Sequence, residues 1–178
     1  MKSQRFGQSA ILSHDDERLL FDALKPRYRL LFGICLYTGC RISEALQLRC
    51  DDISEEIITI RRETTKGQRG TRQIPIALPL RGILSEGSLG SCWVNESRRT
   101  HRPITRQAAD HALRVASCQV GLAGISTHTF RRTALTRMSA AGIPLRTIQS
   151  ISGHRSLDAL QRYLEVSPQD RIIAISKI

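Results

Sequence analysis

The residue types that could do chemistry in this sequence are histidines, arginines and one isolated tyrosine. In the stretch ISGHRSLDALQRYLE, Tyr163 follows His154 by nine residues, and the chain has only three tyrosines. The stretch is either half of a helix-turn-helix or a segment that brings a phenol nucleophile and a phosphate-binding imidazole to one place. An unbroken helix would put the two side chains on opposite faces. A break at residues 153–156 removes that objection.

Two further pairs are spaced three residues apart, which places each pair on one face of a helix. Arg41 and Glu44 in TGCRISEAL are either an oriented guanidinium with its carboxylate or a surface ion pair worth a few tenths of a kcal/mol. His128 and Arg131 in STHTFRRTAL open a helix, and helix N-termini attract anions. That helix either serves a reactive site or only binds a polyanion.

A single lysine, Lys66, lies in TKGQRG between two β-branched runs. Such runs on either side of a glycine-bearing loop predict a β-hairpin with Lys66 in or next to its turn. A lysine at a hairpin tip is commonly just solvated. Lys66 alone therefore does not indicate a functional role, and only its combination with the other motif residues does.

The elements that must position these residues are mostly helices, so we predict an α+β fold that is mainly α-helical, in one domain over residues 1–178. Apolar periodicity, Ser caps and Gly or Pro stops predict the helices. The strands of the hairpin are expected at residues 57–62 and 71–76, with a short third strand around 91–94 in the same small antiparallel sheet. The predicted helices are at about 14–24, 27–38, 41–48, 104–120, 127–141, 144–151 and 156–163.

The charge of the chain points to nucleic acid as the partner. The formal net charge is +11, and the excess of basic residues lies entirely after residue 63. Arginine outnumbers lysine 23 to 4, and the planar guanidinium suits bidentate phosphate contacts. Arg99, Arg102, Arg106 and Arg132 are the candidate DNA-binding residues.

Other classes of protein find little support in the composition. The five cysteines form no C-x-x-C pair, so neither a disulfide framework nor a zinc site is indicated, and all five are expected to be reduced packing residues. Tyr28 and Tyr37 sit in apolar surroundings and are expected in the core. Because no apolar run is long enough to span a bilayer and no secretory leader is evident, we predict a cytoplasmic protein without a membrane partner.

Taken together, the motifs resemble the catalytic domain of the tyrosine recombinase, or phage integrase, family. The resemblance covers about residues 11–166 and rests on the order and separation of all the motifs. It is carried by Arg41 in TGCRISEAL, Lys66 in the hairpin, His128 and Arg131 in THTFRRTAL, His154 in ISGHRS, and Tyr163 nine residues later.

The resemblance implies a site-specific recombinase that needs neither metal nor ATP and no other cofactor. Tyr163 would attack the scissile phosphate to give a 3′-phosphotyrosyl link, and the two arginines, Arg41 and Arg131, would hold the non-bridging oxygens. His128 matches the general base and Lys66 the general acid. His154 would hydrogen-bond the phosphate, and Glu44 would support the site.

The resemblance also implies partners. Family members act on double-stranded DNA, usually as tetramers, and the isolated chain is expected to be a monomer. Most carry an N-terminal core-binding domain that closes a clamp on DNA. This chain begins almost at the catalytic domain, so an accessory protein or a missing clamp domain is expected to assist. Residues 167–178 are a candidate exchange tail. A type IB topoisomerase or a non-catalytic DNA-binding regulator with the same fold are the alternatives.

Overall fold

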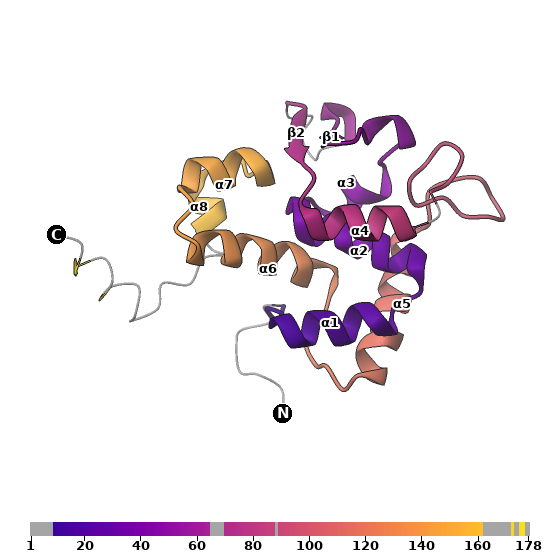
Figure 1. Ribbon diagram of the computed structural model, residues 1–178, viewed down its shortest axis with the longest axis horizontal. Helices are drawn as coiled ribbons and strands as arrows, with labels where there is room; N and C mark the ends of the chain where they lie inside the picture. The colour runs from indigo at the N-terminus through magenta and orange to yellow at the C-terminus, as the bar shows by residue number, and fades with distance from the viewer. Residues whose placement is uncertain (1–8, 65–69, 88, 162–171, 173–174, 177–178) are drawn as a thin grey trace.

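The computed structural model describes residues 9–64, 70–87, 89–161, 172 and 175–176. In this part of the chain, helices make up most of the fold, and one small hairpin lies at its margin (Figure 1). The elements, in order, are α1 (His14–Ala23), α2 (Pro26–Thr38), α3 (Ile42–Leu46), the 3₁₀ turn η1 (Cys50–Asp52), β1 (Ile57–Ile60), the 3₁₀ turn η2 (Arg62–Thr64), β2 (Arg72–Pro75), α4 (Leu78–Glu86), α5 (Arg106–Gln119), α6 (Thr127–Ala140), α7 (Leu145–Ser152) and α8 (Leu157–Gln161).

Helix α2 is the centre of the core and is buried on most of its circumference. It packs against α6, α4, α3 and α5, as expected for a helix that is apolar all round. Phe32 of α2 stacks on Phe130 of α6 with ring centroids 4.6 Å apart, and Phe21 of α1 meets Phe130 edge-on at 6.1 Å. These three rings fix α1, α2 and α6 relative to one another.

Helix α4 was not predicted from the sequence. Pro79 in its first turn and the spacing of Leu80, Ile83 and Leu84 are helical signals that the short, glycine-containing run obscures. The helix is stabilised by close packing on α2, because a Cβ at Gly33 would come within 3.0 Å of Ile83. Tertiary packing on α2 therefore adds to the weak local signals for α4.

The predicted hairpin is confirmed, but the prediction of a third strand is wrong. Strands β1 and β2 pair antiparallel, with Ile57 opposite Pro75 and Ile60 opposite Arg72. Residues 91–94 make only an isolated bridge, between Trp93 and Arg49. The reason is local: the Glu96 carboxylate accepts hydrogen bonds from the backbone N–H groups of Cys92 and Trp93, which curls this segment away from an extended ladder.

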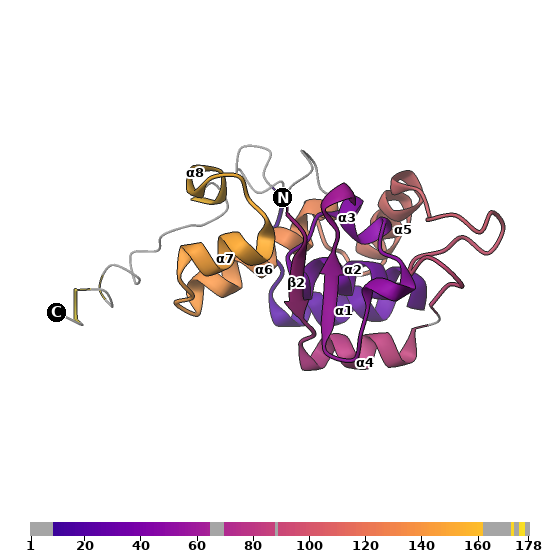
Figure 2. The same cartoon turned by 90° about the horizontal axis from the view of Figure 1, so that it is seen from above.

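The C-terminal helices pack as a separate corner of the molecule. Leu135, Ile148 and Leu160 form a small apolar cluster between α6, α7 and α8. Both ribbon views place α7 and α8 beside one end of α6 (Figures 1 and 2). Gly153 ends α7 with φ of +65°, so the chain reverses just before His154. The predicted break between residues 153 and 156 is confirmed.

The predictions that the cysteines are packing residues and that Tyr28 and Tyr37 lie in the core are only partly correct. Cys35 and Cys40 are buried packing residues, whereas Cys92 and Cys118 are exposed, because they lie on a surface loop and on the outer face of α5. Tyr28 and Tyr37 pack at the margin of the core rather than inside it. The Tyr37 hydroxyl reaches Glu17 at 2.6 Å.

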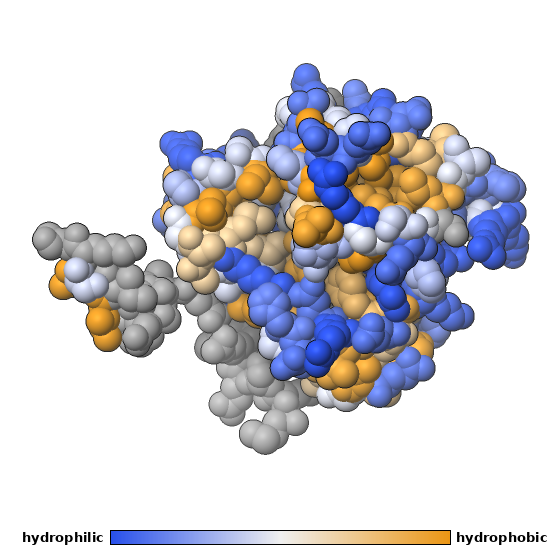
Figure 3. Space-filling model, viewed as in Figure 1, coloured by the Kyte–Doolittle hydropathy of each residue, from blue (hydrophilic) through white to orange (hydrophobic). Residues whose placement is uncertain are grey.

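The outer surface carries isolated apolar side chains between charged ones. Leu78 and Ile143 are among the exposed large hydrophobic residues, and the face in Figure 3 shows apolar areas interrupted by hydrophilic side chains. Within the described residues, no helix combines the length and apolar character needed to cross a bilayer.

Candidate active site

The first part of the site is built where α2 ends and α3 begins. Gly39 adopts φ of +63°, a left-handed conformation that glycine accepts without strain, and this turn places Arg41 at the N-cap of α3. Glu44 is fully buried; its Oε2 accepts the Arg41 backbone N–H at 2.8 Å and its Oε1 accepts Arg41 Nη1 at 3.2 Å. The Arg41 side chain remains about one quarter exposed. The pair is therefore an oriented guanidinium rather than a free surface ion pair.

The second part joins α6 to the turn after α7. Arg131 is buried, and its Nη1 donates to the Gly39 carbonyl at 2.7 Å. Its Nη2 lies 3.1 and 3.0 Å from the two ring nitrogens of His154. One nitrogen cannot lie along the in-plane lone pairs of both ring nitrogens, so the guanidinium contacts the face of the imidazole. His154 Nδ1 is also 2.7 Å from Ser152 Oγ, which fixes the ring.

The imidazole of His128 lies at the start of α6, where Ser126 caps the helix through a capping box with Thr129. Partial burial of the imidazole lowers the pKa of His128, and Arg106, Arg131 and Arg41 lower it further. A lowered pKa keeps the ring neutral near pH 7, as a proton acceptor requires.

The structure thus brings five of the predicted site residues into one region. The carbonyl of Gly39 links Arg131 to the turn that carries Arg41, and His154 contacts Arg131 directly. The five are Arg41, Glu44, His128, Arg131 and His154, and His128 is near enough to Arg131 and Arg41 for their charges to lower its pKa. The remaining two, Lys66 and Tyr163, lie outside the described residues, as does most of the predicted exchange tail at 167–178.

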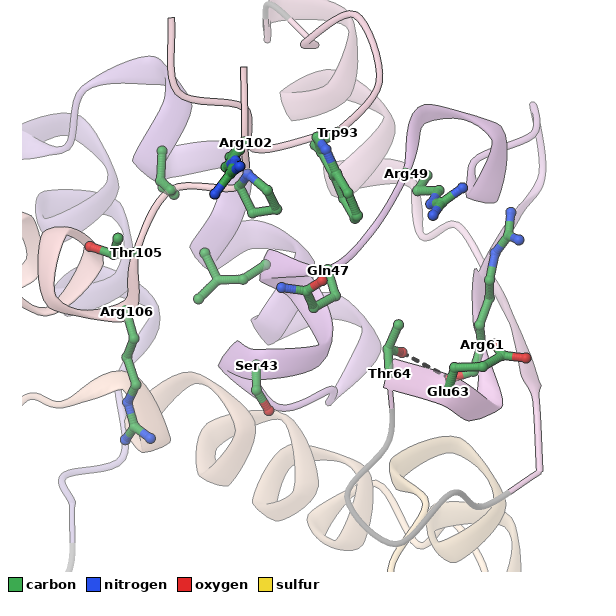
Figure 4. A pocket seen from close by; sticks show the side chains of 13 residues that line it. Ser43, Gln47, Arg49, Arg61, Glu63, Thr64, Trp93, Arg102, Thr105 and Arg106 are labelled. Atoms are coloured by element: carbon green, nitrogen blue, oxygen red, sulfur yellow. Dashed lines mark hydrogen bonds between the residues drawn. The ribbon is translucent and has the colours of Figure 1, made fainter. Parts of the chain in front are cut away.

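A hollow of about 870 Å³ adjoins this region, between α3, the start of α5 and the hairpin. Arg106 lies at one side of the hollow, while Arg49, Arg61 and Arg102 extend from other segments around it (Figure 4). The guanidinium of Arg49 lies over the ring of Trp93, 5.1 Å from its centroid. A concave surface lined by four arginines suits a phosphate backbone.

The predicted DNA-binding arginines fall into different places. Arg102 and Arg106 line the hollow, and Arg99 is exposed in the neighbouring turn. The expectation that Arg132 binds DNA is corrected, because the residue is 4% exposed and donates a hydrogen bond to the Ser9 carbonyl. Adjacent residues of a helix point about 100° apart, and the segment before α1 covers this side of α6.

Sequence reasoning missed Arg49, Arg61 and Arg72. Arg49 and Arg61 carry no motif beyond their charge, and a fold is needed to place them beside Arg102. The sequence did contain a signal for Arg72, because strand alternation puts it on the same side of β2 as the buried Ile74. Its Nη2 reaches Glu44 Oε2 at 3.1 Å.

Metal ligands do not gather in the described residues: no group of three or more His, Cys, Asp or Glu side chains there could hold an ion. The chemistry offered by these residues is cationic and hydrogen-bonding. Such a set can stabilise negative charge on non-bridging phosphate oxygens.

Comparison with known proteins defines the class. The phage integrase family model matches residues 10–170, and the chain belongs to this family. Among curated proteins, it is 32% identical over 162 residues to the putative integrase/recombinase y4qK of Sinorhizobium fredii, covering 88% of this chain and 52% of that protein. It is 29% identical over 177 residues to the tyrosine recombinase XerD of Corynebacterium glutamicum, covering 88% and 57%.

Solved structures share the fold. The XerA recombinase superposes with a TM-score of 0.78 at 20% identity, over 99% of this chain and 66% of that one. The Tn1549 transposon integrase in complex with transposon right end DNA gives 0.80 at 16% identity, over 98% and 67%. The predicted fold class, a mainly helical recombinase catalytic domain with a small antiparallel sheet, is confirmed. The chain spans roughly half of the length of the first curated relative it matches.

Proposed function

We propose that this chain is the catalytic part of a site-specific DNA recombinase that cuts and rejoins strands through a 3′-phosphotyrosyl intermediate. The observation that carries the proposal is the joint placement of Arg41, Arg131 and His154 around the Gly39 turn. Family membership over residues 10–170 supports it. So does the similarity to XerH, whose structure is a pre-cleavage complex with its difH substrate.

The two arginines bind the scissile phosphate in this proposal. Arg41 is held by Glu44 and keeps part of its guanidinium exposed, and Arg131 is anchored at Gly39 with its second nitrogen toward His154. Rigid, pre-oriented donors stabilise charge that builds up on the non-bridging oxygens without reorganising during the reaction. His154, fixed by Ser152, supplies a further hydrogen bond.

Proton transfer falls to His128 and Lys66. A phenol has a pKa near 10, so Tyr163 needs a base or a strongly positive site, and His128 is the neutral imidazole available. Lys66 protonates the leaving 5′-oxygen. Storing the bond as a phosphotyrosyl ester conserves its energy, so that a 5′-hydroxyl can religate without ATP.

Double-stranded DNA is the proposed partner, and it lies over the hollow lined by Arg49, Arg61, Arg102 and Arg106. Four protomers acting on two duplexes, with residues 167–178 passed to a neighbour, complete the proposed assembly. A clamp domain or accessory protein supplies further DNA contacts, since curated relatives are longer than this chain.

The test is covalent capture on nicked suicide duplexes, in which the cut fragment diffuses away and religation is prevented. A pool with a randomised central sequence avoids the need to know the target site, and sequencing of the captured strands then identifies it. We expect a protein–DNA adduct that resists denaturant and is absent in Tyr163→Phe. Tyr28→Phe is the matched control and should retain the adduct.

An adduct that persists in Tyr163→Phe would refute the proposed nucleophile. Relaxation of supercoiled plasmid without exchange between paired sites would favour a topoisomerase. Sequence-specific DNA binding with no adduct on any member of the pool would indicate a regulator.

A further inference from the structure

One buried arginine has no role in the mechanism described so far. Arg72 begins β2 and its side chain is only 9% exposed. Its Nη2 donates to Glu44 Oε2, while Nε and Nη1 are buried and meet no hydrogen-bond acceptor among the described residues. A buried guanidinium is costly unless its charge is compensated, so its position requires an explanation.

The carboxylate of Glu44 is shared between two arginines. Its Oε2 accepts both the Arg41 backbone N–H and Arg72 Nη2, and its Oε1 accepts Arg41 Nη1. Arg72 therefore fixes the carboxylate that in turn fixes Arg41. One carboxylate between two guanidinium groups also leaves one positive charge in excess, which favours an anion at this place.

The opposite side of Arg72 packs against the backbone of Gly153. A Cβ atom at Gly153 would lie 2.2 Å from Arg72 Nη1 and 2.7 Å from its Cζ, so no other residue fits there while Arg72 keeps its place. Gly153 directly precedes His154, which contacts Arg131. Arg72 thus fills the space between the turn that carries Arg41 and the turn that carries His154.

We propose that Arg72 is a positioning residue of the reaction. It sets the orientation of Arg41 through Glu44 and the separation between α3 and the α7–α8 turn through Gly153. The cleavage part of this proposal rests on the proposed function, whereas its effect on Arg41 does not.

The first measurement is independent of cleavage. The Nε–H resonance of Arg41, assigned by its loss in Arg41→Lys, reports how firmly the guanidinium is held. We expect Arg72→Met to shift and broaden this resonance. Arg81→Met, the same substitution at an exposed arginine of α4, should leave it unchanged.

The second measurement is the single-turnover rate of adduct formation at saturating DNA. We expect Arg72→Met to slow it about tenfold, because Arg41 would lose its fixed orientation, with the dissociation constant for DNA changed less than about twofold. Because Arg72 acts on Arg41 through Glu44, Arg72→Met should slow the reaction less in the Glu44→Gln background than in the wild type, and the part that remains reports the contact with Gly153. Arg72→Lys, which keeps the charge but not the planar group under Gly153, should recover part of the rate.

The melting temperature of each variant checks folding, and Arg72→Lys replaces Arg72→Met in both measurements if the latter does not fold. An unchanged Arg41 resonance overturns the proposal, and so does a wild-type rate in Arg72→Met or full additivity with Glu44→Gln. If the Arg41 resonance moves while the wild type forms no adduct, Arg72 positions Arg41 and the recombinase assignment fails.

Discussion

At the scale of single residues, the electrostatics of His128 differ from those of an ordinary surface histidine. Partial burial of the imidazole is the first cause of its lowered pKa, followed by Arg106 and then Arg131, while Asp110 acts in the opposite direction. Below this pKa the ring is protonated and cannot accept a proton. Activity that depends on His128 as a base should therefore be lost toward acid pH and persist at neutral pH.

Two neighbouring substitutions should move this pKa in opposite directions. Arg106→Met removes a positive charge and should raise the pKa of His128 toward the usual value near 6.5, whereas Asp110→Asn should lower it further. Titration of the His128 Cε1–H resonance measures both. Shifts of the same sign in the two variants would contradict the charge assignment.

Arg131 should not tolerate lysine. It holds the Gly39 carbonyl with one nitrogen and contacts His154 with another, and a single ammonium cannot do both. We expect Arg131→Lys to slow adduct formation about a hundredfold while DNA retention in a gel-shift assay changes little.

Arg137→Lys is the matched control for that substitution. Arg137 lies on the same helix but pairs with Glu17 at 2.5 Å, on the side that faces α1. The Arg137→Lys variant should form the adduct at nearly the wild-type rate. Equal losses of binding and cleavage in Arg131→Lys would instead indicate a simple phosphate contact.

At the scale of elements, α6 is the platform of the site, because it carries His128 and Arg131 and is fixed by the aromatic cluster behind them. Phe130 is fully buried between Phe32 and Phe21. On the same helix, Arg131 points toward the site and Arg132 points toward the segment before α1. Packing of the Phe130 face of α6 therefore determines the direction in which His128 and Arg131 point.

Phe130→Ala should lower the free energy of unfolding by about 3–5 kcal/mol, the usual cost of removing a buried aromatic ring. Urea denaturation measures it. Leu78→Ala is the control, since Leu78 is 81% exposed and should change stability by less than about 0.5 kcal/mol. A similar small change in Phe130→Ala would show that the cluster does not fix α6.

At the scale of the whole molecule, the basic excess after residue 63 and the arginine-lined hollow predict electrostatic DNA binding. Each phosphate contact releases counterions, so affinity falls as salt rises. Arg49 and Arg61 come from the less basic N-terminal part of the sequence, and the fold places them with Arg102 and Arg106.

Arg102→Met should weaken DNA binding across all sequences and reduce the slope of log affinity against log salt by about one. Fluorescence anisotropy at several salt concentrations measures the slope. Arg18→Met is the control, because Arg18 lies on α1 and pairs with Asp15. An unchanged slope in Arg102→Met would place DNA elsewhere.

The sequence by itself determined the family, most helix positions and the types of the reactive residues. These follow from local rules: Ser13 and Ser126 cap helices, Gly39 and Gly153 end them, and i,i+3 spacing puts Arg41 with Glu44. Such signals need only a few neighbouring residues, so they can be read without a fold.

Only the tertiary structure decided what each of the other arginines around the site contacts. Arg131 and Arg132 are adjacent and alike in sequence, yet one meets His154 and the other the Ser9 carbonyl, because different elements cover the two sides of α6. Arg72 is 28 residues from Glu44 along the chain, and Ile83 of helix α4 packs closely on Gly33 of α2. Contacts between distant segments depend on how the helices pack, and no local pattern records that packing.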